Sequence, residues 1–220
     1  SHNHHFLGVV VTNGSGSART NVYETYSDEE MIEVRKLEQR KAAMIGEYLG
    51  VVQLGYPSKD VKDRKNDQVI QDLITLLKEA KPDVVYTHNF ADKHDTHIGV
   101  SSKVIHALRS LESHERPNKV YGCEVWRNLD WMIDSEKVVF DVSKHPNLSA
   151  SLIGVFDSQI VGGKRYDLAT EGRRMANATF FTSHEIDQGN QLSYAMDLTP
   201  LIIDDHLDVT EYIKSYIERF

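Results

Sequence analysis

The sequence predicts an α/β protein of the Rossmann-like kind, with a mostly parallel sheet covered by helices on both faces. Two observations support this class. Short apolar, β-branched runs alternate three times with amphipathic stretches between residues 6 and 111, and parallel strands need such helical crossovers. The composition, with 40% hydrophobic and 26% charged residues in 220, is that of a globular chain with a sizeable core. We expect a single domain over residues 1–220.

The elements follow from the periodicity in chain order. Residues 6–12 form a continuous β-branched run, which is typical of a buried parallel strand. After a loop, Ser27 and the acids at 28–30 predict the start of a helix that ends near Gly46 or Gly50. The further expected elements are strands at 51–54, 83–87, 119–124 and 137–141, and helices at 67–80, 96–111, 148–161, 166–177 and 209–219.

Charge and hydropathy exclude several classes of partner. The chain has 25 Lys and Arg against 33 Asp and Glu, a formal net charge of −8, which argues against nucleic acid as a partner. No apolar run approaches the roughly 20 residues of a membrane-spanning helix. The single cysteine, Cys123, excludes an intrachain disulfide and fits a reducing, cytoplasmic compartment. It is expected to be a small buried hydrophobe rather than a nucleophile, and assembly as a homo-oligomer is left open.

Two loops are candidates for a functional site, because parallel α/β sheets bind ligands beyond the carboxyl ends of their strands. They are residues 13–19 and 88–96. Neutral imidazole is a common zinc ligand, and two histidines three positions apart can reach one side of a small site if a helical turn forms there. The second loop therefore favours metal or acid–base chemistry, with a plain surface loop as the alternative. Its ionisable group comprises His88, Asp92, His94, Asp95 and His97.

The first loop, Asn13-Gly-Ser-Gly-Ser17, does not fit a phosphate-binding motif. A P-loop needs a Lys that is absent, and a dinucleotide fingerprint needs a third Gly where Arg19 stands. We expect a flexible loop whose small residues let a ligand approach the backbone, or a plain solvated connector. A second acidic group near the C-terminus, Asp204-Asp205-His206, is interpreted as a solvated turn rather than a ligand cluster.

An ordered set of short motifs spans most of the chain. Each is weak alone, but together they closely resemble the PIG-L/LmbE-like family of zinc-dependent N-acetylglucosaminyl deacetylases. The motifs are Thr12-Asn-Gly14 after the first strand, Arg35-x-x-Glu38 with Ala42-Ala43, Leu54-Gly-Tyr-Pro57, Lys81-Pro-Asp-Val-Val-Tyr-Thr-His88, His94-Asp-Thr-His97, Phe140-Asp-Val-Ser143 and Ser158-Gln159.

The resemblance implies a zinc-dependent hydrolase that removes an acetyl group from a small-molecule N-acetylglucosamine-type conjugate. It implies one Zn²⁺ per chain, bound by His97, and a catalytic role for His94 in steadying the oxyanion or protonating the leaving amine. Arg35 matches an arginine that the family uses near substrate, and Asn13 is assigned to substrate binding with it. Thr96 stands where the family usually has Asp, which leaves the effect of this position on activity open.

The sequence departs from the family pattern at its front. The family's other zinc ligands, a His and an Asp, come from a His-x-Asp-Asp motif on an earlier strand–helix unit, and residues 1–20 contain no such motif. We expect the first βα unit and both ligands to lie upstream of residue 1. The alternatives are a catalytically dead relative, a non-catalytic sugar- or nucleotide-binding module, and a zinc amidohydrolase that acts on a non-sugar amide.

Overall fold

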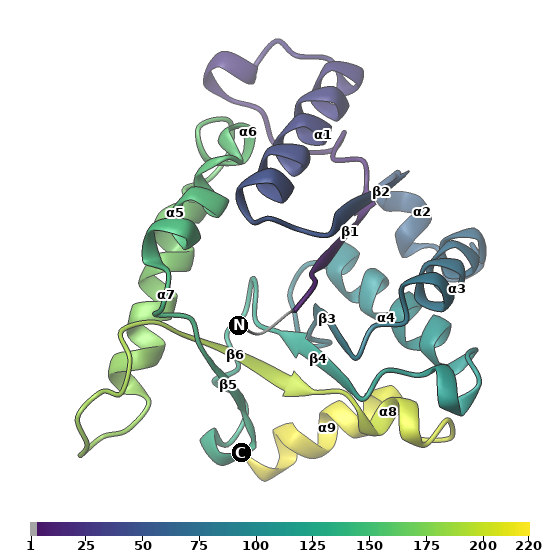
Figure 1. Ribbon diagram of the computed structural model, residues 1–220, viewed down its shortest axis with the longest axis vertical. Helices are drawn as coiled ribbons and strands as arrows, with labels where there is room; N and C mark the ends of the chain where they lie inside the picture. Colours follow the sequence, from purple (N-terminus) through teal and green to yellow (C-terminus); the bar gives the residue numbers. More distant parts are fainter. Residues whose placement is uncertain (1–3) are drawn as a thin grey trace. The chain divides into compact units, whose positions relative to one another are not determined.

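The computed structural model describes residues 4–220 (Figure 1). Contacts divide the chain into two compact units, Ser1–Ser58 with Val142–Gln191 and Lys59–Asp141 with Leu192–Phe220. Each unit is therefore assembled from two separate stretches of sequence. Among the residues described, no helix is both long enough and apolar enough to cross a membrane.

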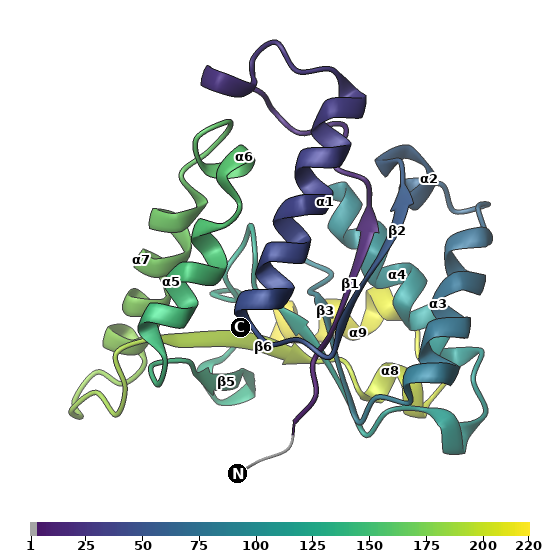
Figure 2. The same cartoon turned by 45° about the horizontal axis from the view of Figure 1, so that its top comes forward.

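The first unit contains a parallel pair of strands, which lie side by side in Figure 2. They are β1 (Leu7–Thr12) and β2 (Gly50–Tyr56), with Val9 opposite Val52 and a change of register before Thr12. The connection between them is α1 (Asp28–Ile45), which packs on β2. The strand–helix–strand unit that the sequence predicted is thus confirmed.

Helix α1 begins and ends at the residues that the sequence marks. The Ser27 side chain accepts a hydrogen bond from the Glu30 N–H, and the Glu30 carboxylate accepts one from the Ser27 N–H, which makes a capping box. Gly46 is the C-cap. Local capping chemistry therefore fixes both ends of this helix.

The helix expected over residues 148–161 is two helices, α5 (Pro146–Gly154) and α6 (Asp157–Ile160). In a continuous helix the Ser158 N–H would bond to the carbonyl of Gly154. It donates instead to the carboxylate of Glu38, at 2.7 Å. A tertiary hydrogen bond thus replaces a helical one at this point. The unit is completed by η1 (Asn21–Tyr23) and by α7 (Tyr166–Phe180), which packs on α5 (Figure 1).

The second unit contains a four-stranded sheet in the order β3-β4-β6-β5. β3 (Val84–His88) and β4 (Lys119–Cys123) are parallel, whereas β6 (Leu192–Asp197) is antiparallel to both β4 and β5 (Val138–Asp141). The α/β class is confirmed, but the antiparallel pairing and β6 were not predicted. The β6 sequence, Leu-Ser-Tyr-Ala-Met-Asp, contains no β-branched residue, so it lacks the strand propensity that marked the others.

Helices α3 (Gln68–Ala80) and α4 (Asp95–Arg109) pack against each other, and α4 also packs on β3 (Figure 1). The core of this unit includes Leu108, Val120 and Met196, which are fully buried. The remaining helical elements are α2 (Ser58–Lys62), η2 (Ser113–Glu115), η3 (Asp134–Glu136), α8 (Pro200–Ile203) and α9 (Val209–Arg219).

Candidate functional site

The predicted site residues fall into two groups, one in each unit. His94 and His97 belong to the second unit, at the start of α4. Asn13 follows β1 in the first unit, and Arg35 lies on α1.

The connection from β3 to α4 brings histidine rings together. His88 is the last residue of β3, His94 is the N-cap of α4, and His97 lies in its first turn. The ring centroids of His88 and His97 are 4.0 Å apart with 6° between their planes, and those of His94 and His97 are 4.6 Å apart with 22°. Trp126 stacks on His94 in turn, at 6.1 Å. The two predicted histidines therefore lie in one aromatic stack.

Asp92 is the buried acid of this cluster, and its side chain has 0% exposure. Its Oδ1 accepts a hydrogen bond from the His94 N–H at 2.9 Å. Its Oδ2 lies 3.2 Å from His97 Nδ1 and accepts from the Trp126 N–H at 3.4 Å. Burial raises the pKa of Asp92, but these hydrogen bonds outweigh it and leave the pKa below its usual value. The sequence placed Asp92 in this group but assigned it no role.

Buried hydrogen bonds hold the connection in place. The Asn89 side chain is fully buried, and its amide and its backbone N–H both donate to the carbonyl of Cys123, at 2.9 and 3.1 Å. Asn89 Oδ1 accepts from the N–H of Ala91. Ser101 of α4 donates to the carbonyl of His88 at 2.7 Å. The histidines therefore project from a backbone whose polar groups are paired locally.

Two of the histidines have a lowered pKa, which favours their neutral form. Burial and then the neighbouring His97 lower the pKa of His88 to about 4, although Asp92 opposes this. Burial also lowers the pKa of His97, against the opposite effect of Asp92. Neutral imidazole is the form that binds a metal ion.

The donor set does not make a complete metal site by itself. Among residues 4–220, no group of three or more His, Cys, Asp or Glu side chains is arranged to hold an ion. A catalytic zinc typically takes three protein ligands. The side chains described therefore do not supply the full ligand set of a catalytic zinc.

The loop after β1 packs closely on α1. Gly14 has a φ of +77°, and a Cβ at this position would lie 2.8 Å from Arg35 Cγ. Only glycine meets both conditions without strain. Asn13 Oδ1 accepts hydrogen bonds from the N–H and the hydroxyl of Ser15, which folds the loop into a turn.

Asn13 and Arg35 line the same pocket, whose volume is about 160 Å³. The Arg35 guanidinium is mostly buried; it pairs with Glu38 at 3.1 Å and lies 5.6 Å from the centroid of the Phe156 ring. The structure thus brings together the two residues that the sequence assigned to substrate. Other polar residues lining the pocket are Lys36, Gln39 and Gln53.

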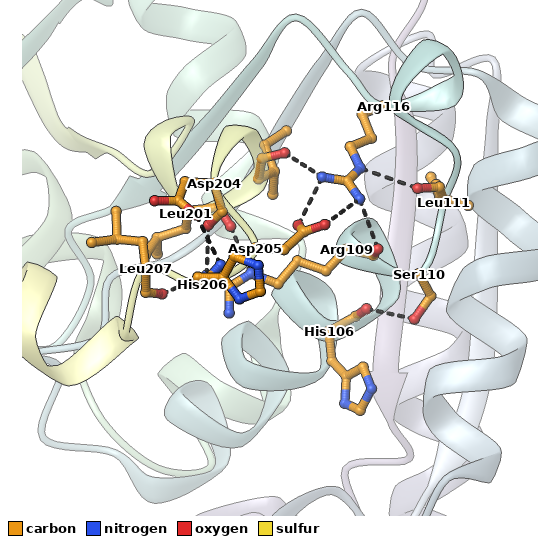
Figure 3. A network of polar contacts seen from close by, with 11 residues as sticks. His106, Arg109, Ser110, Leu111, Arg116, Leu201, Asp204, Asp205, His206 and Leu207 are labelled. Atoms are coloured by element: carbon orange, nitrogen blue, oxygen red, sulfur yellow. Dashed lines mark hydrogen bonds and ion pairs between the residues drawn. The ribbon is translucent and has the colours of Figure 1, made fainter.

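The second acidic group is a turn, as the sequence indicated (Figure 3). The Asp204 carboxylate accepts a hydrogen bond from the His206 N–H at 2.9 Å. The Asp205 carboxylate accepts hydrogen bonds from both terminal nitrogens of Arg116, at 2.8 and 2.9 Å. Arg109 donates to the carbonyl of Leu201 at 2.7 Å. These side chains link α4 to the segment around α8.

A comparison with known protein families finds a match over residues 1–108 of the chain. The family described as PIG-L, GlcNAc-PI de-N-acetylase, matches residues 1–108. Residues 1–108 belong to the PIG-L family. This match confirms the family resemblance that the sequence motifs indicated. The matched range also contains the four predicted site residues. No curated protein matches the chain.

Solved structures share the fold over most of the chain. The N,N'-diacetylchitobiose deacetylase of Pyrococcus horikoshii has a TM-score of 0.66 at 16% identity, covering 94% of this chain and 78% of its own. The A40926 pseudoaglycone deacetylase Dbv21 has 0.61 at 12% identity, covering 89% and 85%. GalB of Pseudomonas putida KT2440, a 4-carboxy-2-hydroxymuconate hydratase, has 0.58 at 13%, covering 88% and 96%. Since deacetylases and a hydratase share this fold, the likeness decides architecture and not chemistry.

Proposed function

We propose that this PIG-L family protein is an amide hydrolase that removes the acetyl group from an N-acetylglucosamine-type sugar conjugate. The observation that carries the proposal is the pairing of His94 with His97, whose rings are stacked at 4.6 Å at the start of α4. Both residues lie within the range that matches the family. The two deacetylases of similar fold support the same class of reaction.

The reaction adds water across the acetyl C–N bond. The hydroxyl joins the acyl carbon to give acetate, and a proton joins the nitrogen to give the amine. We assign the delivery of this proton to His94, whose exposed side chain is at the N-terminal end of α4. Imidazole is the side chain best suited to proton transfer near neutral pH, and its protonated form also stabilises a neighbouring oxyanion.

We propose His97 as one ligand of a single Zn²⁺ ion. Its Nδ1 faces Asp92 at 3.2 Å, the arrangement in which the other ring nitrogen binds metal in carboxylate–histidine–zinc triads. Amide hydrolysis requires a polarised carbonyl and an activated water, which is the chemistry that zinc supplies.

The pocket beside α1 is the proposed place of substrate contact in the first unit. Arg35 offers a guanidinium and Asn13 an amide, both donors to the hydroxyl and carbonyl oxygens in which a sugar conjugate is rich. Gly14 lets the backbone approach closely there.

The test is to incubate the full-length, zinc-supplied protein with N-acetylglucosamine conjugates, diacetylchitobiose among them, and to measure acetate and free amine. We expect both products in equal amounts. Binding of the sugar without acetate release would overturn the hydrolase and favour a non-catalytic sugar-binding module. Cleavage of a non-sugar N-acetyl amide alone would overturn the substrate class while keeping the reaction.

A further inference from the structure

We infer that Asp92 is a positioning residue for His97, which it holds in one ring orientation with the proton on Nδ1, so that Nε2 is the atom presented to a metal ion. The inference rests on the proposed function for the role of His97 as a ligand. The contact itself lies wholly within the second unit.

The direction of the hydrogen bond follows from the other partners of Asp92. Backbone N–H groups of His94 and Trp126 donate to its Oδ1 and Oδ2, and an N–H can pair only with an acceptor. Oδ2, which accepts from Trp126, is also the oxygen 3.2 Å from His97 Nδ1. Two backbone N–H donors favour the ionised form of this carboxylate, which can only accept, so the ring nitrogen is the donor in this contact. A neutral imidazole carries one N–H, so Nε2 is left with its lone pair.

The stack and the hydrogen bond restrict different motions of the ring. His88 lies parallel to His97 at 4.0 Å, which limits tilting of the His97 plane. A 180° flip of the ring about its Cβ–Cγ bond leaves the ring plane unchanged and so keeps the stack, but it places carbon Cδ2 against Asp92 instead of Nδ1. The carboxylate therefore selects between two flipped orientations that the stack alone would allow.

Burial strengthens this selection. The Asp92 side chain has no exposed surface, whereas that of His97 is 21% exposed. Water cannot replace the ring as a partner of Asp92 Oδ2 without entering a closed space, and a buried carboxylate that loses a donor is destabilised. Asp95 offers a matched comparison, because it is an exposed acid in the first turn of the same helix.

The first experiment needs no variant. Long-range ¹H–¹⁵N spectra of the ¹⁵N-labelled chain, recorded without added metal, report which ring nitrogen of each histidine carries the proton. We expect His97 to carry it on Nδ1. A proton on Nε2 would overturn the inference, and this result is independent of any deacetylase activity.

The second experiment compares Asp92→Asn with Asp95→Asn. Asn has one acceptor oxygen and an NH₂ group, so it cannot accept from both His94 N–H and His97 Nδ1 on separate oxygens. We expect the Nε2–H tautomer of His97 to appear in Asp92→Asn, and Zn²⁺ affinity of the full-length protein to fall about 10–100-fold. Asp95→Asn should change neither.

An unchanged tautomer and zinc affinity in folded Asp92→Asn would overturn the inference. If this variant does not fold, the wild-type spectrum decides. Absence of zinc binding in the full-length wild type would count against the proposed function, and the tautomer of His97 would still decide the role of Asp92.

Discussion

Glu38 and Ser158 are 120 positions apart in the chain and are joined by two buried hydrogen bonds. The Ser158 N–H donates to Glu38 Oε1 at 2.7 Å, and the Ser158 hydroxyl donates to Oε2 at 2.8 Å. Arg35 contacts the same Oε2 at 3.1 Å. One carboxylate thus ties α6 to α1 and also holds the arginine of the pocket.

Replacing this carboxylate should cost stability. We expect Glu38→Ala to lower the free energy of unfolding by about 2–4 kcal/mol, because the Ser158 N–H and the mostly buried Arg35 lose their partner. Urea denaturation measures the effect. Glu33→Ala, an exposed acid on the same helix, is the control and should stay within about 0.5 kcal/mol of wild type. Equal midpoints for the two variants would show that the buried hydrogen bonds of Glu38 do not stabilise the fold.

Gly14→Ala should disturb the pocket through Arg35. The positive φ and the 2.8 Å approach of a Cβ to Arg35 Cγ predict a stability loss of about 1–3 kcal/mol. The displaced guanidinium should raise KM for the sugar conjugate more than it lowers kcat. Gly16→Ala is the matched control, since its Cβ would meet no atom within 4 Å. The same KM in both variants would argue against substrate contact by Arg35.

Arg116 should matter more for stability than the acid it pairs with. Besides the Asp205 carboxylate, it donates to the carbonyls of Leu111 and Arg109 (Figure 3). It also donates to the carbonyl of Ile202. We expect Arg116→Lys to lower the free energy of unfolding by about 2 kcal/mol, because an ammonium cannot reproduce the planar fork. Asp205→Asn, at an exposed carboxylate, should have a smaller effect on the thermal midpoint. The reverse order would show that the ion pair dominates the network.

Cys123 should react slowly in the folded protein. Burial, and then the charge of Glu124, raise the pKa of Cys123 to about 11. At pH 8 the thiol is therefore protonated in all but about one molecule in a thousand, and the thiolate is the reactive form. Labelling with a chromogenic disulfide should be fast in urea and slow without it. Equal rates in both conditions would contradict the raised pKa of this half-buried thiol.

Much of the fold could be predicted because its signals are local. The capping box of Ser27 and Glu30 and the C-cap at Gly46 mark α1 within the chain itself, and β-branched runs mark the parallel strands. The break between α5 and α6 was not predictable in this way, because a residue of α1, Glu38, takes the Ser158 N–H. Strand β6 was missed because its pairing partners, and not its own composition, make it a strand.

In the candidate site, too, local features could be predicted from the sequence and tertiary contacts could not. Residue type and spacing identified His94, His97 and the loop that holds them. The role of Asp92 depends on Trp126, 34 positions further on, whose N–H shares the carboxylate with His97. Spacing along a sequence cannot report such a contact, so the acid was recognised as part of the group but not as the partner of one ring.

We propose that His94 delivers the proton to the leaving amine and that His97 binds the zinc ion. Zinc content of the protein, measured by atomic emission for His94→Ala and His97→Ala, distinguishes these roles. We predict near-normal zinc in His94→Ala, with turnover at least about 10²-fold lower, and a loss of zinc in His97→Ala. Equal loss of zinc in both variants would contradict the claim.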